Sequence, residues 1–258
     1  MPKDSMRYFL QCSFFGKHYH GWQRQPTDLS VQGVLEDCLG KLLGSEVEIV
    51  GAGRTDAGVH ARVMYAHFDS PEPLPAELIH RLNAFLPGDI AVQQIFPVQP
   101  EAHARFDALS RTYQYFLVQE KDPFSEDTAF YQNRPLDFKL MNQAAAYLLE
   151  FEDFKAFSKS RTDVKTYLCN ITHAQWQEEG IRWVFTISAD RFLRNMVRAI
   201  VGTLLEVGKG NLSPEDVKTI IKSRARSRAG ASVPAKGLYL TGISYPKQIH
   251  LSDGKRKR

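Results

Sequence analysis

The order of the expected strands and helices constrains this fold more than any other feature of the 258 residues, because it occurs twice. Apolar residues recur every three or four positions in 31–43, where Ser30 is suited to cap a helix and Gly44 to end it. The neighbouring strand segments are short, apolar and β-rich. The first half is thus predicted to run strand, helix, strand, strand, helix, strand over residues 7–14, 31–43, 47–50, 64–68, 76–85 and 90–98.

The second half repeats this order with one additional helix, which begins at Ser213 with a proline in its first turn. The arrangement predicts an α+β fold of two ferredoxin-like halves (βαββαβ, RRM-like), whose sheets join into one long, mainly antiparallel sheet with helices on one face. We expect an N-terminal domain at 1–105, a C-terminal domain at 106–247 and a basic tail at 248–258. The expected elements of the second half are strands at 111–118, 167–176, 182–188 and 238–244 and helices at 138–149, 193–207 and from 213.

Composition narrows the class of protein. No apolar run approaches the length of a membrane span, and residues 1–6 lack the apolar core of a signal peptide, so a cytoplasmic protein without membrane contact is expected. The three cysteines are far apart and lie in apolar segments, which predicts buried thiols rather than disulfides. The pair His18 and His20 has no second pair of ligands to accompany it, so we predict no metal and no cofactor.

Positive charge is clustered, although the formal net charge is only +4. Local clusters suit phosphate groups, and a sheet with basic residues above it suits nucleic acid. The alternative is that each cluster is a solvated face, which is the better interpretation for the terminal run. The clustered residues are Arg191, Arg194 and Arg198, then Arg224, Arg226 and Arg228, and finally 255–258.

The segment 51–61, GAGRTDAGVHA, holds one carboxylate, Asp56, between glycines and beside Arg54. Glycines allow positive φ and close approach by a ligand, so Asp56 is the leading candidate for a nucleophile or base. A dinucleotide-binding loop is disfavoured, because Gly58 comes five residues after Gly53 and the residues that follow alternate like a strand. A glycine-rich hairpin with Asp56 as a turn residue remains an alternative.

These residues resemble the TruA family of tRNA pseudouridine synthases, whose signature around the catalytic aspartate has the pattern of 51–61. The resemblance spans nearly the whole chain, in order. One departure stands at Phe14-Phe15-Gly16, where the family has Tyr-Asp-Gly, so that a local carboxylate contact is lost. The other matching segments are 20–25, 30–36, 83–90, 103–106, 111–115, 153–158, 192–198 and 237–240.

The resemblance implies a homodimeric enzyme that flips uridines out of the anticodon stem-loop of tRNA and converts them to pseudouridine, at tRNA positions 38, 39 and 40. It makes Asp56 catalytic, and it gives Arg54 the task of pairing with Asp56 or holding the displaced nucleotide. Arg198 matches the arginine that pairs with the aspartate. Tyr113 matches the tyrosine that stacks on the target base, and Leu240 is expected to contact the substrate.

The residues themselves fit part of this assignment. An isomerisation can proceed with one carboxylate, whereas glycoside hydrolysis usually uses two and a water molecule. Arg198 lies among apolar residues, so partial burial is expected, and a buried guanidinium needs an anionic partner; a solvated face is the alternative for Arg194. Tyr113 and Tyr115 share a strand face by their period of 2, and core packing is the favoured interpretation for Tyr115.

Two other classes of function compete with the synthase. A noncatalytic tandem RRM-like module would bind RNA, but the chain lacks an RNP1-type aromatic signature, and binding alone does not need a glycine-framed aspartate. A hydrolytic glycosidase acting on nucleosides would release free uracil, whereas an isomerase would not.

Overall fold

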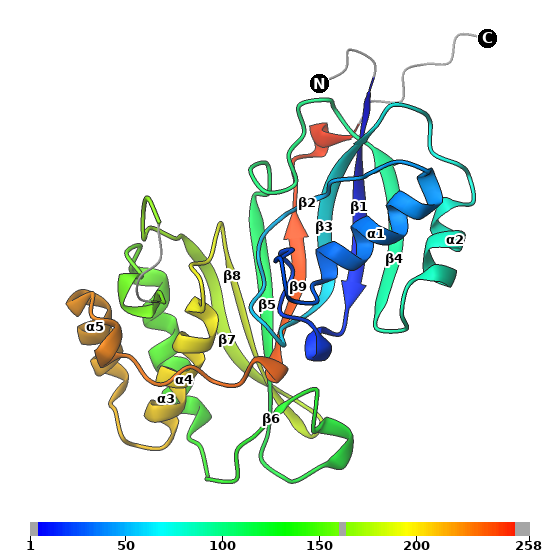
Figure 1. Ribbon diagram of the computed structural model, residues 1–258. Helices are drawn as coiled ribbons and strands as arrows, with labels where there is room; N and C mark the ends of the chain where they lie inside the picture. Colours follow the sequence, from blue (N-terminus) through cyan, green and yellow to red (C-terminus); the bar gives the residue numbers. More distant parts are fainter. Residues whose placement is uncertain (1–4, 160–163, 251–258) are drawn as a thin grey trace. The chain divides into compact units, whose positions relative to one another are not determined.

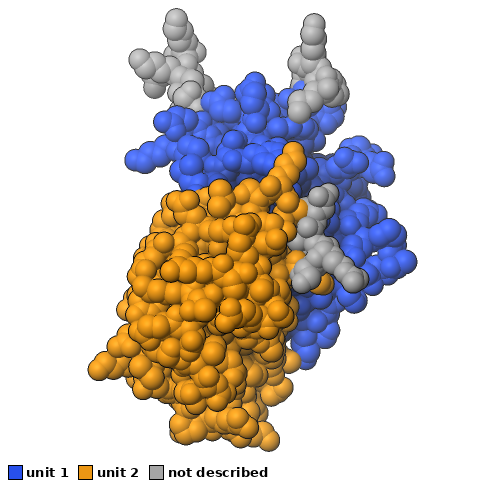
Figure 2. All heavy atoms as spheres, turned by 90° about the vertical axis from the view of Figure 1, so that its left-hand side faces the viewer, with its two compact units in different colours: residues 1–109, 241–258 blue, residues 110–240 orange. Residues whose placement is uncertain are grey.

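The computed structural model describes residues 5–159 and 164–250. This part of the chain is a mixed α+β protein with a large, mainly antiparallel sheet and five α-helices. The chain divides into two compact units, shown in blue and orange in Figure 2. Unit 1 comprises residues 1–109 and 241–258, and unit 2 comprises residues 110–240. Most of the predicted basic tail, residues 251–258, lies outside the described residues.

The strands of unit 1 lie in the order β4-β1-β3-β9, with the short β2 also against β3. The pairs of β1 with β3 and β4, and of β2 with β3, are antiparallel. In the central strand β1, Tyr8 lies opposite Phe68 on one side and Pro97 on the other. Figure 1 shows helix α1 crossing in front of these strands, and α1 contacts α2, which contacts β4. The elements are β1 (Met6–Phe14), α1 (Val31–Leu43), β2 (Val50–Gly51), β3 (His60–Ser70), α2 (Leu78–Phe85) and β4 (Ile90–Pro97).

In unit 2 the order is β9-β5-β8-β7, and the short β6 runs parallel to β5. Helix α3 contacts α4, α5 and strand β7, so the helices of this unit form a connected group (Figure 1). The elements are β5 (Ser110–Val118), β6 (Phe130–Tyr131), α3 (Phe138–Ala146), β7 (Ile171–Glu179), β8 (Arg182–Ala189), α4 (Met196–Gly208), α5 (Pro214–Ser223) and β9 (Leu238–Ser244).

The capping signals in the sequence set the ends of α1 and α5. The Ser30 hydroxyl accepts a hydrogen bond from the Gly33 N–H at 3.2 Å, and Gly44 ends α1 with φ 71°. At α5, Ser213 and Asp216 form the reciprocal capping box, with a proline in the first turn. The bounds predicted for α1 are therefore confirmed residue for residue, and those predicted for strand β9 are confirmed as well.

The strand expected at 47–50 is wrong for most of its length, since only Val50 pairs, together with Gly51, against β3. Val47 and Ile49 are buried, which explains their apolar character, but the Ile49 N–H donates to the Glu36 carboxylate at 3.1 Å. A side chain therefore satisfies a backbone group that the prediction had assigned to a sheet partner.

Helix α4 begins at Met196, three residues later than predicted, because Asn195 adopts the left-handed conformation with φ 65°. That backbone is incompatible with a continuing right-handed helix. The three cysteines are free and buried, as predicted. Burial raises the pKa of the Cys12 thiol. No helix in the described ranges is long and apolar enough to cross a bilayer.

Candidate active-site loop and groove

The candidate catalytic residue Asp56 lies in unit 1, in the loop between β2 and β3, and its side chain is half-buried. The Val59 N–H donates to the Asp56 carbonyl at 3.2 Å, and Gly58, with φ 77°, donates to the Tyr19 carbonyl at 3.2 Å. The chain therefore turns tightly just after Asp56 and enters β3. The predicted strand after the loop is confirmed by β3, His60–Ser70.

Two glycines from the preceding segment allow the backbone to press against this loop. Gly21 has φ 90°, and a Cβ there would lie 3.2 Å from the Thr55 carbonyl carbon and closer still to its oxygen. A Cβ at Gly16 would collide with the Val59 carbonyl oxygen. The loop is thus held on both sides of Asp56, at Thr55 and at Val59, by backbone contacts that only glycine permits.

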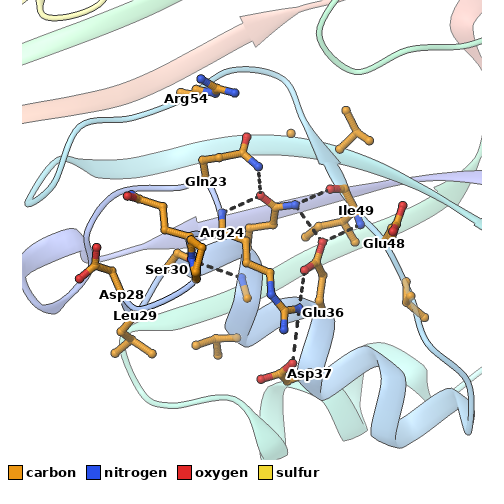
Figure 3. Close-up of a pocket in the computed structure, with 18 of the residues that line it drawn as sticks. Gln23, Arg24, Asp28, Leu29, Ser30, Glu36, Asp37, Glu48, Ile49 and Arg54 are labelled. Carbon is orange, nitrogen blue, oxygen red and sulfur yellow. Dashed lines mark hydrogen bonds and ion pairs between the residues drawn. The ribbon is translucent and has the colours of Figure 1, made fainter.

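Arg54 extends from the same loop into an open groove of about 860 Å³ within unit 1, where Figure 3 shows it as a labelled side chain. Its side chain is exposed, and among the described residues no hydrogen bond or ion pair joins the Arg54 guanidinium to another group. Arg105 lines the same groove. Arg24 lines it as well, so three arginines face the groove, and one of them, Arg54, belongs to the loop that holds Asp56.

A buried polar network forms the opposite wall of the groove (Figure 3). The Gln32 side-chain oxygen accepts hydrogen bonds from the Arg24 N–H at 2.9 Å and from the Gln23 amide at 2.7 Å. The Gln32 amide donates to Glu36 and to the Ile49 carbonyl, both at 2.9 Å. Glu36 also accepts from the Arg24 guanidinium at 2.9 Å. The matching segments 20–25 and 30–36 therefore build one wall together.

Tyr113 and Tyr115 lie on β5 in unit 2 and differ in exposure. Tyr115 is completely buried, and its hydroxyl donates to the Pro234 carbonyl at 3.0 Å. Burial raises its pKa. The predicted core packing of Tyr115 is therefore confirmed. Tyr113 is half-buried and meets Phe192 edge to face at 5.2 Å between ring centroids.

Arg198 lies in the first turn of α4 in unit 2 and is half-buried, as its apolar neighbours predicted. Its Nε donates to the Val233 carbonyl at 2.7 Å. Leu240 is buried within β9, with 2 % of its surface exposed. Arg194 is exposed, in line with a solvated face. Asp56 belongs to unit 1 and Arg198 to unit 2, and their pairing stays a prediction.

Comparison with known proteins gives the family. The family model described as tRNA pseudouridine synthase matches residues 12–107 and 144–246. This chain belongs to the tRNA pseudouridine synthase family. It is therefore an isomerase. The tRNA pseudouridine synthase A of Parabacteroides distasonis is 52 % identical over 245 residues, covering 94 % of this chain and 97 % of the relative.

Other relatives of the same name extend the match. The tRNA pseudouridine synthase A of Bacteroides fragilis is 52 % identical over 246 residues, which cover 94 % of this chain and 98 % of the relative. That of Francisella tularensis subsp. holarctica is 39 % identical over 243 residues, which cover 93 % of this chain and 94 % of the relative. The resemblance inferred from the motifs is confirmed over nearly the full length of the chain.

Within this synthase chain, Phe15 fills the position where the motif comparison expected an aspartate. Its ring stacks on His60 at 4.2 Å between centroids, with planes 23° apart. The Nδ1 of His60 accepts the Gly16 N–H at 2.9 Å, so the imidazole is held between the two segments. An aromatic contact thus occupies the place of the expected carboxylate.

Two arginines of the basic cluster at 224–228, Arg224 and Arg226, are engaged within the protein. Arg224 forms an ion pair with Asp153 at 3.1 Å. Arg226 donates to the Gly230 carbonyl at 3.1 Å and to the Ser232 hydroxyl at 2.9 Å. Arg226 therefore helps to fix the segment that follows α5, a role that neither the phosphate-binding nor the solvated-face interpretation had considered.

Proposed function

We propose that this synthase converts uridine to pseudouridine in the anticodon stem-loop of tRNA, with Asp56 as the catalytic carboxylate. The observation that carries the proposal is the loop itself. In a chain of this family, one half-buried aspartate sits where glycine contacts hold the backbone and an exposed Arg54 points into a groove. The relatives' name, tRNA pseudouridine synthase A, supports the substrate class.

The reaction balances without a second substrate. The bond from N1 of uracil to C1′ of the ribose breaks, the base turns, a bond from C5 to C1′ forms, and the C5 proton is released while N1 gains one. No oxidant, reductant or water is consumed. The Asp56 carboxylate acts as nucleophile or base. The detached base must be retained throughout, so the pocket needs contacts to its ring face.

Four further residues complete the proposed site. Arg54 is an exposed residue of the catalytic loop, where it holds the displaced nucleotide. Tyr113 keeps part of its ring open and stacks on the target base, which typically contributes about 1–3 kcal/mol. Arg198 pairs with Asp56, and its Nε bond to Val233 orients the guanidinium. Leu240 lines the base pocket from β9.

The proposal includes the architecture inferred from the sequence. Within unit 1 the strand order β4-β1-β3, with β2 against β3, is the order of a ferredoxin-like half, and in unit 2 β9-β5-β8-β7 follows the same order. We infer two such halves joined in one long sheet with helices on one face, a homodimer, and a cytoplasmic location where tRNA is available.

Tritium release from tRNA labelled at C5 of uridine tests the proposal directly. Wild type should release tritium, whereas Asp56→Asn should lower turnover by at least about 1,000-fold while tRNA binding persists. Glu72→Gln is the matched control, because Glu72 is an exposed carboxylate of the same unit that does not line the groove, and it should behave as wild type. Retained turnover in Asp56→Asn would refute the catalytic assignment.

The position and type of reaction need separate readouts. Replacing the uridines of the anticodon stem-loop by cytidine should abolish release, and release that persists would move the target elsewhere in the tRNA. Chromatography of the products should show pseudouridine. Free uracil in its place would support the glycosidase, and tRNA binding without any product would support the RNA-binding module.

A further inference from the structure

The segment 101–109 of unit 1 exposes a large aromatic ring. Phe106 has 75 % of its surface exposed, although it belongs to the matching segment 103–106. Single exposed apolar side chains are common on soluble proteins, so exposure alone indicates nothing. The way in which this ring is held is what distinguishes it from the exposed Leu109 nearby.

Three rings line up from the core to the surface at this point. Phe106 lies 4.2 Å from the ring of His103, and His103 lies 4.6 Å from that of the buried His67. The His103 Nδ1 accepts the N–H groups of Arg105 at 3.1 Å and Phe106 at 3.3 Å, and His67 Nδ1 accepts the Ala104 N–H at 3.1 Å. Both imidazoles therefore fix the backbone that carries Phe106.

Further hydrogen bonds anchor the ends of the segment. The Arg7 guanidinium donates to the Ala102 carbonyl at 3.0 Å, and the Tyr245 hydroxyl donates to the Ala104 carbonyl at 2.6 Å. The Leu109 N–H donates to the Ser244 carbonyl at 2.8 Å. An aromatic ring presented on a backbone that is already ordered loses little conformational entropy when it binds a ligand.

Arg105 connects the ring to the groove. Its guanidinium lies 5.8 Å from the centroid of Phe106, and Arg105 lines the groove that also holds Arg54. Acidic residues also line the groove, and Figure 3 shows one of them, Asp37 on α1, at the opposite side from Arg54. An aromatic face beside an arginine combines the two features that recognise a single-stranded nucleotide, namely base stacking and phosphate attraction.

We propose that Phe106 and Arg105 form a stacking platform for an unpaired base of the RNA substrate, with the Arg105 guanidinium at the adjoining phosphate. The inference rests on the proposed function and deepens it, because it adds a contact for a nucleotide other than the uridine under conversion. The surroundings favour RNA over a protein partner, since the adjoining groove is lined largely by polar and charged side chains, whereas the centre of a protein interface is depleted of charge.

The Kd of the full chain for an unmodified tRNA transcript tests the platform. Phe106→Ala should raise the Kd about 5- to 150-fold, whereas Phe106→Trp should restore wild-type binding because it keeps a stacking face. Leu109→Ala is the matched control: it removes an exposed apolar side chain, 59 % exposed, from the same segment and should leave the Kd unchanged. Equal thermal midpoints for the variants would show that the fold is retained.

The phosphate contact of Arg105 and the identity of the base that stacks on Phe106 can be tested separately. Arg105→Gln should reduce the slope of log Kd against log salt concentration by about 1, and Arg105→Lys should restore it. Transcripts with one abasic site at each loop position identify the stacked base. At that position, Phe106→Ala and the abasic site should cost no more together than either costs alone, because both remove the same contact.

Unchanged tRNA affinity in Phe106→Ala would overturn the platform. A shift from dimer to monomer in this variant, with the affinity of each chain for tRNA preserved, would assign Phe106 to a contact between copies and overturn it equally. The platform and the proposed function fail independently. Product formation by wild type with no effect of Phe106→Ala on binding rejects only the platform, whereas weakened binding without any pseudouridine in wild type rejects only the catalytic proposal.

Discussion

Replacing Gly21 with alanine should misplace the catalytic loop without touching any residue that carries chemistry. Gly21 has φ 90°, where a residue with a side chain is strained by about 1–3 kcal/mol. The added Cβ would also lie less than 3.0 Å from the Thr55 carbonyl oxygen, a contact that Cβ atoms essentially never make in real structures. Because backbone atoms cannot swing aside, the segment and the loop must separate by on the order of 1 Å.

The expected loss is larger in activity than in stability. A misplacement of about 1 Å near a reacting centre can cost about 100-fold in rate. The strain should lower the thermal midpoint by roughly 4–8 °C in a chain of this size if about 2 kcal/mol is lost. Tritium release under kcat/KM conditions and thermal unfolding at neutral pH measure the two effects.

Gly53→Ala is the matched control, since it places the same methyl group in the same loop where it meets nothing within 4 Å. Its thermal midpoint should stay within about 2 °C of wild type, or rise slightly because the unfolded chain loses freedom. If Gly21→Ala also keeps its midpoint and retains kcat/KM within threefold, the idea that glycine contacts hold the loop is wrong.

Two further perturbations report on buried polar groups of unit 1. Burial, and after it the charge of Arg7, lowers the pKa of His67 from 6.5 to about 4. As the pH falls, the unfolded chain therefore takes up this proton before the folded protein does. The free energy of unfolding keeps the full contribution of neutral His67 above pH 6.5 and falls by at most about 3 kcal/mol as the pH drops to about 4. Unfolding midpoints measured across this range should show the fall, and His67→Gln should flatten it; an equal slope in both proteins would contradict the assignment. Glu36→Ala should cost about 2–4 kcal/mol in denaturant unfolding, because the Gln32 amide and Ile49 N–H lose their acceptor. Asp37→Ala, with its side chain 64 % exposed, should cost less than about 0.5 kcal/mol, and similar losses in the two variants would count against the buried network.

The sequence predicted the elements where local signals act alone. Helix α1 has a serine cap, an apolar stripe and a terminating glycine, and all three decide its bounds without help from distant residues. The segment 47–50 shows the limit of this reasoning. Its apolar residues are buried as expected, but the Glu36 carboxylate binds the Ile49 N–H, and no periodicity encodes a hydrogen bond across 13 residues.

The candidate site shows the same division. The glycines and the lone Asp56 indicated the loop because they are adjacent in the sequence, so their residue types alone predict its chemistry. The groove wall built by Gln32 and Glu36 was missed, although two polar residues four apart, on the same face of the helix, could have signalled a hydrogen-bonded pair. The ring stack behind Phe106 was missed because His67 and His103 come from segments 36 residues apart, and only the fold brings them together.

Strand β9 has a consequence for how the protein is made. Its first three residues belong to unit 2 and its last four to unit 1, where β9 is the neighbour of β3. The ribosome therefore translates about 130 residues of unit 2 after the first 109 residues of unit 1 and before the last strand of unit 1. At roughly 5–20 residues per second this delay lasts about 7–26 s. During that interval part of the β3 edge is unpaired on the nascent chain, and an unpaired strand edge is a site of aggregation.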